Sequence, residues 1–256
     1  MDANTSGQER TVAILVAAAA IITIGFNWLA TTGRVGGVTP AEISDKYQTL
    51  VTPAGYAFSI WSLIYLGIIA FSIYQFGSNI NERVRSIRWL FIASCLLNCG
   101  WIYFWHHDQI AVCLVLIATL AVCLFLIALR LRETDNLKEF WFAKAPFSIY
   151  FGWVTAATLV NFAILLVSRQ IEVGIWLSVA LIAIAGAFGL IIRVSLRNYI
   201  YPLAIAWAVT AIAVKQSGET AIVVTAAIVV VACLIAALSF VVGLPSSSDQ
   251  NQRASS

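Results

Sequence analysis

Charged side chains are scarce in this chain, and this scarcity excludes several classes of protein. Of its 256 residues, 11% are charged and 61% are hydrophobic, whereas soluble domains carry about 25% charged and roughly 45–50% apolar residues. The composition excludes an ordinary soluble enzyme and a disordered chain. The net charge of +3 is spread over short loops and forms no basic stripe of the kind that binds DNA or RNA, so we expect no nucleic-acid partner.

Charge is missing above all from the centres of the long apolar segments. No Asp, Glu, Lys or Arg lies near the middle of any of them. Proton and ion relays within membranes normally use such groups, so their absence disfavours a proton-coupled antiporter or pump. The segments also hold no general acid or base, and no serine in them has a base partner within sequence reach, so nucleophilic catalysis has no support. We therefore predict that the protein is not an enzyme.

Disulfide and metal-binding patterns are missing as well. The five cysteines lie in apolar runs without a CxxC spacing, which argues against a disulfide framework, and we interpret them as small buried hydrophobic residues. His106 and His107 point about 100° apart on a helix end, a geometry that rarely serves one metal. We predict a solvated helix end there, with a haem axial ligand or a pH-sensitive gate as the alternative, and no metal site or required cofactor.

Long apolar runs, in contrast, are abundant. A membrane-spanning helix needs about 20 mostly apolar residues, and backbone groups in lipid must bond internally, so each run predicts a helix. We predict an all-α, polytopic transmembrane bundle of about eight helices, the seventh being the shortest. The predicted helices cover residues 12–31, 54–76, 88–106, 110–130, 146–168, 173–192, 198–215 and 219–243.

Basic residues are distributed unevenly between the two sides of this bundle. With eight helices, 11 of the 15 Lys and Arg residues fall on the side that carries both termini. The positive-inside rule then predicts an integral membrane protein with both termini in the cytoplasm, in a bacterial inner membrane. The first apolar run is longer than the roughly 7–15 residues of a signal-peptide core, so we expect it to remain as a helix.

Several segments outside the helix centres also carry local signals. Thr39 and Pro40 are suited to the cap and the first position of a short interfacial helix in loop 32–52. Residues 131–145 mix charged with aromatic side chains, which predicts an amphipathic interfacial segment. Residues 244–256 predict a polar, disordered tail. Ala185 and Gly189 permit close helix packing, either within the chain or in a homodimer.

Three of the predicted helices carry aromatic and amide side chains on a single face. A mid-membrane Asn is costly when it faces lipid, so these faces should point at protein or a cavity. Rings with a few polar groups are the usual lining of a small-molecule site. The residues share a stripe on each helix because they recur at helical spacing: Phe58, Trp61 and Tyr65; Asn98, Trp101 and Trp105; Tyr150, Trp153, Ala157 and Asn161.

The other tryptophans suit a different role. Trp and Tyr are enriched at membrane–water interfaces, and one group of tryptophans lies near predicted helix ends, where we assign it to an interfacial belt. For Trp61, Trp101 and Trp153, which lie further inside, the spacing leaves packing and ligand contact equally open. The predicted belt residues are Trp28, Trp89, Trp105, Trp141 and Trp176.

The segments PAGYAFSIWSLIY (53–65), LNCGWIYFW (97–105) and PFSIYFGWVTAATLVN (146–161) resemble the second-, third- and fifth-helix motifs of the TspO/MBR family, the tryptophan-rich sensory or translocator proteins. The resemblance covers about residues 12–168. It implies a five-helix ligand-binding bundle over residues 1–168, with a cavity closed by the first long loop. By the same resemblance Trp61 and Trp153 lie at the cavity, Ala157 is a small cavity-facing residue, and Asn98 and Trp101 belong to the third-helix motif.

The chain also departs from that family pattern. Loop 32–52 has no Trp, the fourth helix lacks the acidic residue of many members, and three additional helices follow over residues 169–243. The resemblance implies binding of porphyrins and other hydrophobic molecules such as sterols, and a link to stress signalling.

Our leading hypothesis is a membrane receptor that binds a hydrophobic ligand, such as a porphyrin or haem, without turning it over. A transporter of that ligand is the first alternative, although helices broken by Gly or Pro in matching halves are not seen. A tetrapyrrole-modifying enzyme is the second, since a porphyrin-degrading activity has been proposed for some bacterial family members.

Overall fold

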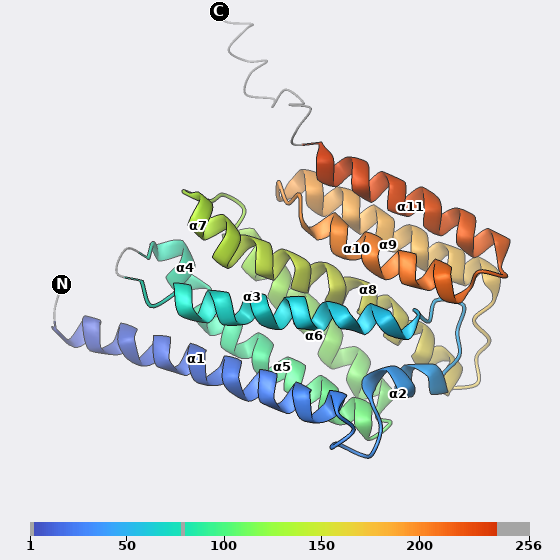
Figure 1. Cartoon of the computed structure of the whole chain (residues 1–256), viewed down its shortest axis with the longest axis horizontal. Coiled ribbons are helices and arrows are strands. Elements are labelled where there is room, and N and C mark those ends of the chain that lie inside the picture. Colours follow the sequence, from blue (N-terminus) through green and yellow to red (C-terminus); the bar gives the residue numbers. More distant parts are fainter. Residues whose placement is uncertain (1–2, 78–79, 240–256) are drawn as a thin grey trace, which may run out of the picture.

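The computed structural model describes residues 3–77 and 80–239, and every regular element in them is helical. The long helices run roughly along the long axis of the molecule (Figure 1). The elements are α1 (Ala3–Thr31), α2 (Pro40–Lys46), the 3₁₀ turn η1 (Gly55–Ser59), α3 (Ile60–Tyr74), α4 (Glu82–Ser86), α5 (Arg88–His106), α6 (Ile110–Arg130), α7 (Leu137–Glu139), the π-helical turn η2 (Phe140–Lys144), α8 (Ala145–Ser168), α9 (Ile175–Ser195), α10 (Tyr201–Lys215) and α11 (Thr220–Leu238).

Seven of the described helices are long and apolar enough to cross a membrane. The predicted seventh helix is the shorter α10, whose 15 residues span about 22 Å, less than the roughly 30 Å of a hydrocarbon core. These seven helices and α10 account for the eight predicted apolar runs. The prediction of a polytopic helical bundle is therefore confirmed.

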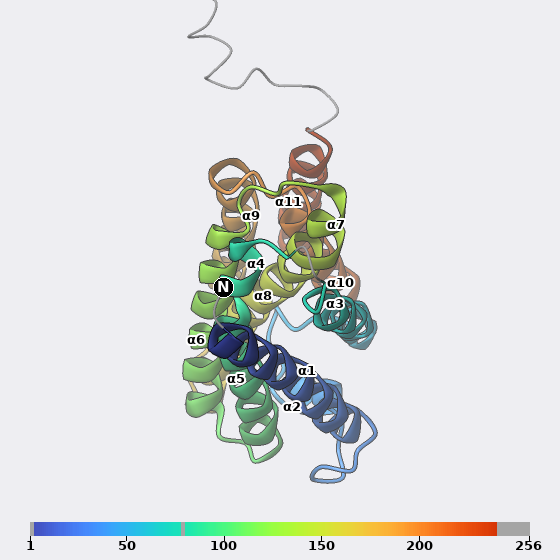
Figure 2. The ribbon, with the colours of Figure 1, turned by 90° about the vertical axis from the view of Figure 1, so that its left-hand side faces the viewer.

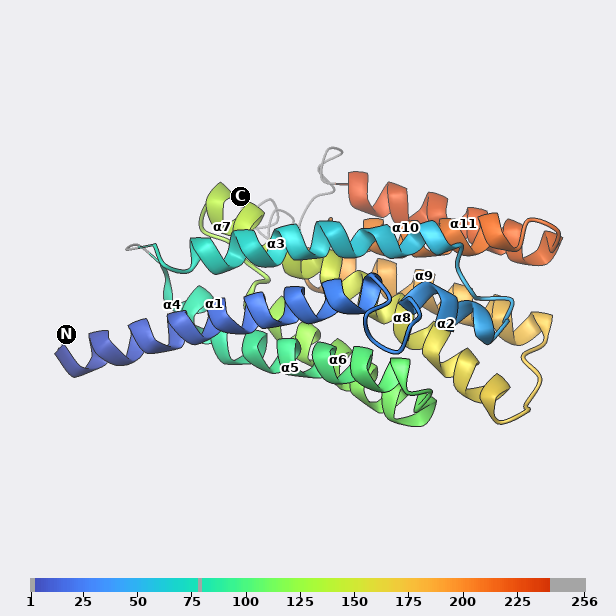
Figure 3. The same cartoon turned by 60° about the horizontal axis from the view of Figure 1, so that its bottom comes forward.

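Helix α8 lies at the centre of the bundle. It packs against α3, α6, α9 and α10. Helix α1 packs on α3 and α5, and α11 packs on α9 and α10. In Figure 3, α10 and α11 lie on the opposite side of the bundle from α1 and α5. The three C-terminal helices are thus attached to the rest of the chain mainly through α8.

The connecting segments follow the sequence signals only in part. Thr39 caps α2 with the predicted geometry, accepting a hydrogen bond from the Glu42 backbone while the Glu42 carboxylate accepts one from the Thr39 backbone. Residues 131–145 form α7 and η2, which lead directly into α8. Leu137 and Trp141 there are exposed and Glu139 is fully buried. The predicted tail lies outside the described residues.

The basic loops gather at one end of the molecule. The start of α1, α4 and α7 lie toward the same end in Figure 1, and these elements carry Arg10, Arg83, Arg85 and Lys138. The assignment of this end to the cytoplasm stays a prediction.

The small residues of α9 pack within the chain. A Cβ added to Gly186 would lie 2.8 Å from Val229 Cγ2, and one added to Gly189 would lie 2.8 Å from Cys233 Sγ. Both partners belong to α11. The sequence left close packing within the chain and packing in a homodimer open for Ala185 and Gly189. For Gly189 the structure shows packing within the chain.

Candidate functional site

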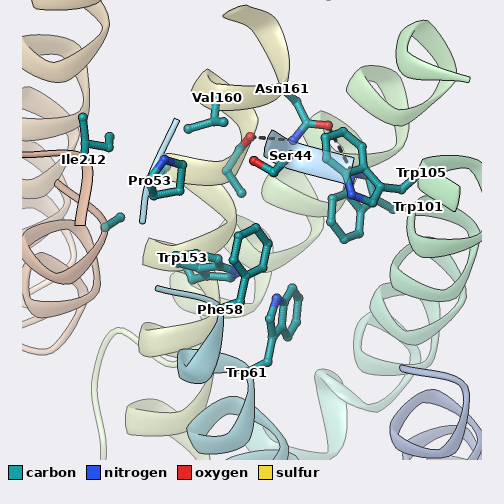
Figure 4. A pocket seen from close by; sticks show the side chains of 13 residues that line it. Ser44, Pro53, Phe58, Trp61, Trp101, Trp105, Trp153, Val160, Asn161 and Ile212 are labelled. Carbon is teal, nitrogen blue, oxygen red and sulfur yellow. Dashed lines mark hydrogen bonds between the residues drawn. The ribbon is translucent and has the colours of Figure 1, made fainter. Parts of the chain in front are cut away.

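The aromatic stripes of three helices meet in one pocket next to α8 (Figure 4). Phe58 and Trp61 come from η1 and α3, Trp101 from α5, and Trp153 from α8. Loop residues close one side of the pocket, and α10 forms another. The complete lining is Ser44, Pro53, Phe58, Trp61, Trp101, Trp105, Trp153, Ala156, Ala157, Val160, Asn161, Ala208 and Ile212.

Ring-to-ring contacts narrow this pocket. The Trp153 ring lies edge-on to Phe58, with centroids 5.9 Å apart, and edge-on to Trp61, with centroids 6.4 Å apart. Counted with its open mouth, the empty space among the lining atoms is about 470 Å³. Within this space there is room for roughly two water molecules, since one water needs about 10–15 Å³ of accessible space. A larger guest would have to push these rings apart.

Six of the nine candidate residues line the pocket, and three do not. The six are Phe58, Trp61, Trp101, Trp153, Ala157 and Asn161. Tyr65 stacks on the Trp61 ring at 5.6 Å and Tyr150 lies edge-on to it at 5.8 Å, so both support Trp61 from behind. Asn98 is buried and accepts a hydrogen bond of 2.7 Å from the Asn27 side chain on α1. The Tyr150 hydroxyl and Asn98 Nδ2 are buried without a hydrogen-bond partner.

The polar end of the pocket is tightly hydrogen-bonded. Trp101 Nε1 donates to Asn161 Oδ1 at 3.2 Å, and Asn161 Nδ2 donates to the Ala157 carbonyl at 2.9 Å. Trp105 stacks on Trp101 at 5.4 Å and donates from its indole N–H to the Pro40 carbonyl at 3.2 Å. Trp105 is therefore buried under the loop helix, and its assignment to the interfacial belt was wrong.

The aromatic end of the pocket has unused donors. Trp61, Phe58 and Trp153 form one group in Figure 4, apart from Trp101, Trp105 and Asn161. In the described part of the chain, the indole N–H groups of Trp61 and Trp153 make no hydrogen bond. Both rings line the pocket. The pocket is thus an apolar slot that carries two free N–H donors at one end.

Helix α10 forms one wall of the pocket and is fastened to the loop that covers it. The Ala54 backbone N–H donates to the Ala211 carbonyl at 3.0 Å, and Trp207 Nε1 donates to the Ala57 carbonyl at 3.0 Å. Lys215 at the end of α10 forms an ion pair with Asp45 of α2. The pocket residues Ala208 and Ile212 belong to this helix, and no sequence signal marked them because an even run of small apolar residues has no distinctive face.

Polar contacts fasten α2, whose Ser44 lines the pocket, to the end of α5. Lys46 pairs with Asp108, and the Tyr47 hydroxyl donates to Asp108 at 3.1 Å. The hydrogen bond to Asp108 raises the pKa of Lys46, and hydrogen bonds from Thr39 lower the pKa of Glu42, so both stay charged near neutral pH. The His-His-Asp turn at the end of α5 thus anchors the loop through Asp108. The described residues contain no group of three or more His, Cys, Asp or Glu side chains able to hold a metal.

A comparison with known protein families shows to which family the chain belongs. A family model described as TSPO-like protein matches residues 13–240. The chain belongs to the TSPO-like family. The match continues past residue 168 through α9, α10 and α11, so these helices lie within the family pattern. No curated protein and no solved structure matches the chain. Family membership makes the chain a membrane-embedded protein of a sensory or binding type.

The hydrogen bond between Trp101 and Asn161 is expected to stabilise the pocket of this TSPO-like protein. Replacing Asn161 by Leu removes the acceptor that the buried Trp101 N–H has in the described part of the chain. We expect a loss of about 1 kcal/mol, since hydrogen bonds between membrane helices contribute about 0.6 kcal/mol on average and up to about 1.7 kcal/mol. Trp101→Phe should remove most of the effect of a subsequent Asn161→Leu change in a double-mutant cycle. Additive losses in unfolding by detergent titration would contradict the pairing.

Proposed function

We propose that the protein binds a flat hydrophobic molecule of the tetrapyrrole class in the aromatic pocket and releases it unchanged. The observation that carries the proposal is the convergence of Phe58, Trp61, Trp101 and Trp153 from separate elements on one apolar slot. Flat conjugated rings stack on such side chains, and aromatic pairs gain about 0.5–1.5 kcal/mol beyond their buried area.

The chemistry of the lining suits such a guest. The free indole N–H groups of Trp61 and Trp153 offer donors to a carbonyl or carboxylate of the ligand. Lys46 follows the lining residue Ser44 by two residues and Lys215 follows Ile212 by three, and each lysine is paired with an aspartate. These lysines would attract the acidic side groups of a porphyrin. The macrocycle needs more width than the slot has, so Phe58 and Trp153 must separate. Phe58 lies on the short turn η1, which makes it the ring best placed to move.

Binding without turnover is proposed because the lining has no general acid or base. The pocket is lined by apolar residues and by Ser44 and Asn161, and Asn161 already holds Trp101. A transporter of the same ligand remains the alternative, although the described membrane segments have no charged group near their centres. We keep the proposal that the protein lies in a bacterial inner membrane with both termini in the cytoplasm.

Titration of the detergent-purified protein with protoporphyrin IX tests the proposal. Saturable quenching of Trp fluorescence is expected, and Trp61→Ala or Trp153→Ala should weaken binding about tenfold, which corresponds to about 1.4 kcal/mol. Trp176→Ala removes an exposed tryptophan and serves as the matched control for the change in signal. Ala157→Leu, which fills the slot, should also weaken binding, while Ala227→Leu on an exposed part of α11 should not.

Unchanged affinity in Trp61→Ala, Trp153→Ala and Ala157→Leu would remove the pocket from the proposal. Recovery of altered pigment in the dark would overturn binding without turnover. Gradient-dependent uptake of protoporphyrin into proteoliposomes would favour the transporter.

A further inference from the structure

A second hollow lies on the outer surface of the bundle, where α6 and α9 flank α8. Figure 2 shows α6 and α9 on the same side of the molecule. The hollow encloses about 750 Å³ when its open side is included. Its floor is buried, and Val122 and Phe188 on its walls are 58% and 43% exposed. Its lining is Ala121, Val122, Phe125, Phe151, Thr155, Thr158, Leu159, Phe188 and Ile192.

The groove presents only apolar surface to an occupant. The Thr155 hydroxyl donates to the Phe151 carbonyl at 2.9 Å and accepts from the Tyr201 hydroxyl at 2.9 Å. The Thr158 hydroxyl donates to the Val154 carbonyl at 2.8 Å. Because both hydroxyls already make hydrogen bonds within the protein, an occupant of the groove does not have to supply a polar group. All three helices qualify as membrane spans, so the occupant available to this groove is hydrocarbon.

A basic residue lies close to one end of each of the three groove helices, at the same end of the bundle. Arg132 follows α6, Lys144 precedes α8, and Arg197 follows α9. Arg132 and Arg197 both approach one carboxylate, with Arg132 Nε 4.0 Å and Arg197 Nη1 3.5 Å from Glu133 Oε1. Lys144 donates to the Arg132 carbonyl. Two arginines therefore share one carboxylate, and both arginine side chains are more than half exposed.

The spacing along the helices joins this cluster to the groove. Phe125 and Phe151, whose rings lie 6.2 Å apart, mark the end of the groove nearest the cluster. Arg132 follows Phe125 by seven residues and Lys144 precedes Phe151 by seven, which is roughly 10 Å along a helix. An apolar slot at membrane depth, followed after this distance by an exposed positive cluster, has the layout of a phospholipid acyl chain and its phosphate.

We propose that this groove holds one acyl chain of an anionic phospholipid of the surrounding bilayer, with its headgroup at Arg132 and Arg197. Arg132 and Arg197 outnumber Glu133, and this excess of positive charge favours an anionic headgroup, because arginines near a membrane surface attract anionic lipids. Glu133 turns from both arginines when the phosphate binds. The lipid site and the aromatic pocket lie on different faces of α8, so the site does not depend on the proposed ligand binding.

Native mass spectrometry of the delipidated full chain tests the site. We titrate it with phosphatidylglycerol and with phosphatidylcholine of identical acyl chains. Wild-type protein should bind the first phosphatidylglycerol at least about tenfold more tightly than phosphatidylcholine. Arg132→Gln combined with Arg197→Gln should abolish the difference, while Arg34→Gln combined with Arg169→Gln, at the other end of the bundle, should preserve it.

Variants that fill the groove test the binding of the acyl chain independently of the binding of the headgroup. Ala121→Phe should weaken binding of both lipids, and Val122→Trp, on an exposed wall, provides the same block if Ala121→Phe fails to fold. Equal wild-type affinity for both lipids overturns the headgroup assignment. Unchanged lipid binding in the folded groove-filling variant overturns the groove. Loss of protoporphyrin binding in Trp61→Ala with the lipid preference intact would show that the two sites are separate.

Discussion

Replacing Arg83 by methionine should destabilise the protein by about 3 kcal/mol, the lower end of the roughly 3–5 kcal/mol lost when one partner of a buried ion pair is removed. The guanidinium lies 3.0 Å from Glu139, whose side chain is fully buried, while that of Arg83 is 27% exposed. The other Glu139 oxygen accepts from Asn81 Nδ2 and from the Asp135 backbone, both at 2.9 Å. Without Arg83 the buried carboxylate loses the ion-pair partner that it has in the described part of the chain.

Loss of Arg83 should weaken more than one contact, because the cluster of Arg83, Asn81, Asp135 and Glu139 joins the α3–α5 connection to the α6–α8 connection. Arg83 also donates to the Glu133 carbonyl at 2.6 Å and to Asp135 at 3.1 Å. Free energies of unfolding from detergent titration measure the loss. Arg85→Met, which removes an arginine of the same short helix, is the matched control, since the Arg85 side chain makes no hydrogen bond or ion pair in residues 3–77 and 80–239.

Neutralising the stranded carboxylate should restore part of the stability. Glu139→Gln in the Arg83→Met background keeps the hydrogen bonds from Asn81 and Asp135 within reach of the side chain and removes the charge. An Arg83→Met variant as stable as Arg85→Met would contradict a structural role for the buried pair.

The helices themselves could be predicted because charged residues lie at the ends of the apolar runs. The predicted helix 110–130 coincides with α6 (Ile110–Arg130), and the prediction 88–106 coincides with α5 (Arg88–His106). The prediction fails where local hydrogen bonding overrides composition. Residues 198–200 precede α10, because the Asn198 side chain accepts from the Tyr201 backbone at 3.1 Å and fixes the helix start.

The candidate site was predictable only for residues that share a helix face at one depth. Periodicity groups Phe58, Trp61 and Tyr65 on one stripe, but it does not say that Tyr65 lies behind Trp61. Trp105 sits near a helix end in the sequence, and only the folded loop shows that α2 covers it. Pro53 and Ser44 reach the pocket through that same loop, a contact between distant segments that no local pattern encodes.

Replacing Gly152 by alanine should force α10 away from α8, and it tests the wall of the pocket that the sequence did not reveal. A Cβ at Gly152 would lie 2.7 Å from Ala204 Cβ and 2.7 Å from the Tyr201 carbonyl oxygen. Neither atom belongs to a flexible side-chain end, so the helices themselves must shift. Overpacking of this kind costs about 1–3 kcal/mol. The same substitution at Gly25 of α1, where nothing lies within 4 Å, removes a flexible residue without a clash.

The two glycine variants should therefore differ in sign. Gly25→Ala should leave stability unchanged or raise it by up to about 1 kcal/mol, as expected for a helical glycine, whereas Gly152→Ala should lower it. Since α10 carries Ala208 and Ile212 into the pocket lining, Gly152→Ala should also weaken protoporphyrin binding, and Gly25→Ala should not. If Gly152→Ala loses stability but keeps full affinity, the close approach of α8 and α10 is real and the contribution of α10 to ligand binding is wrong.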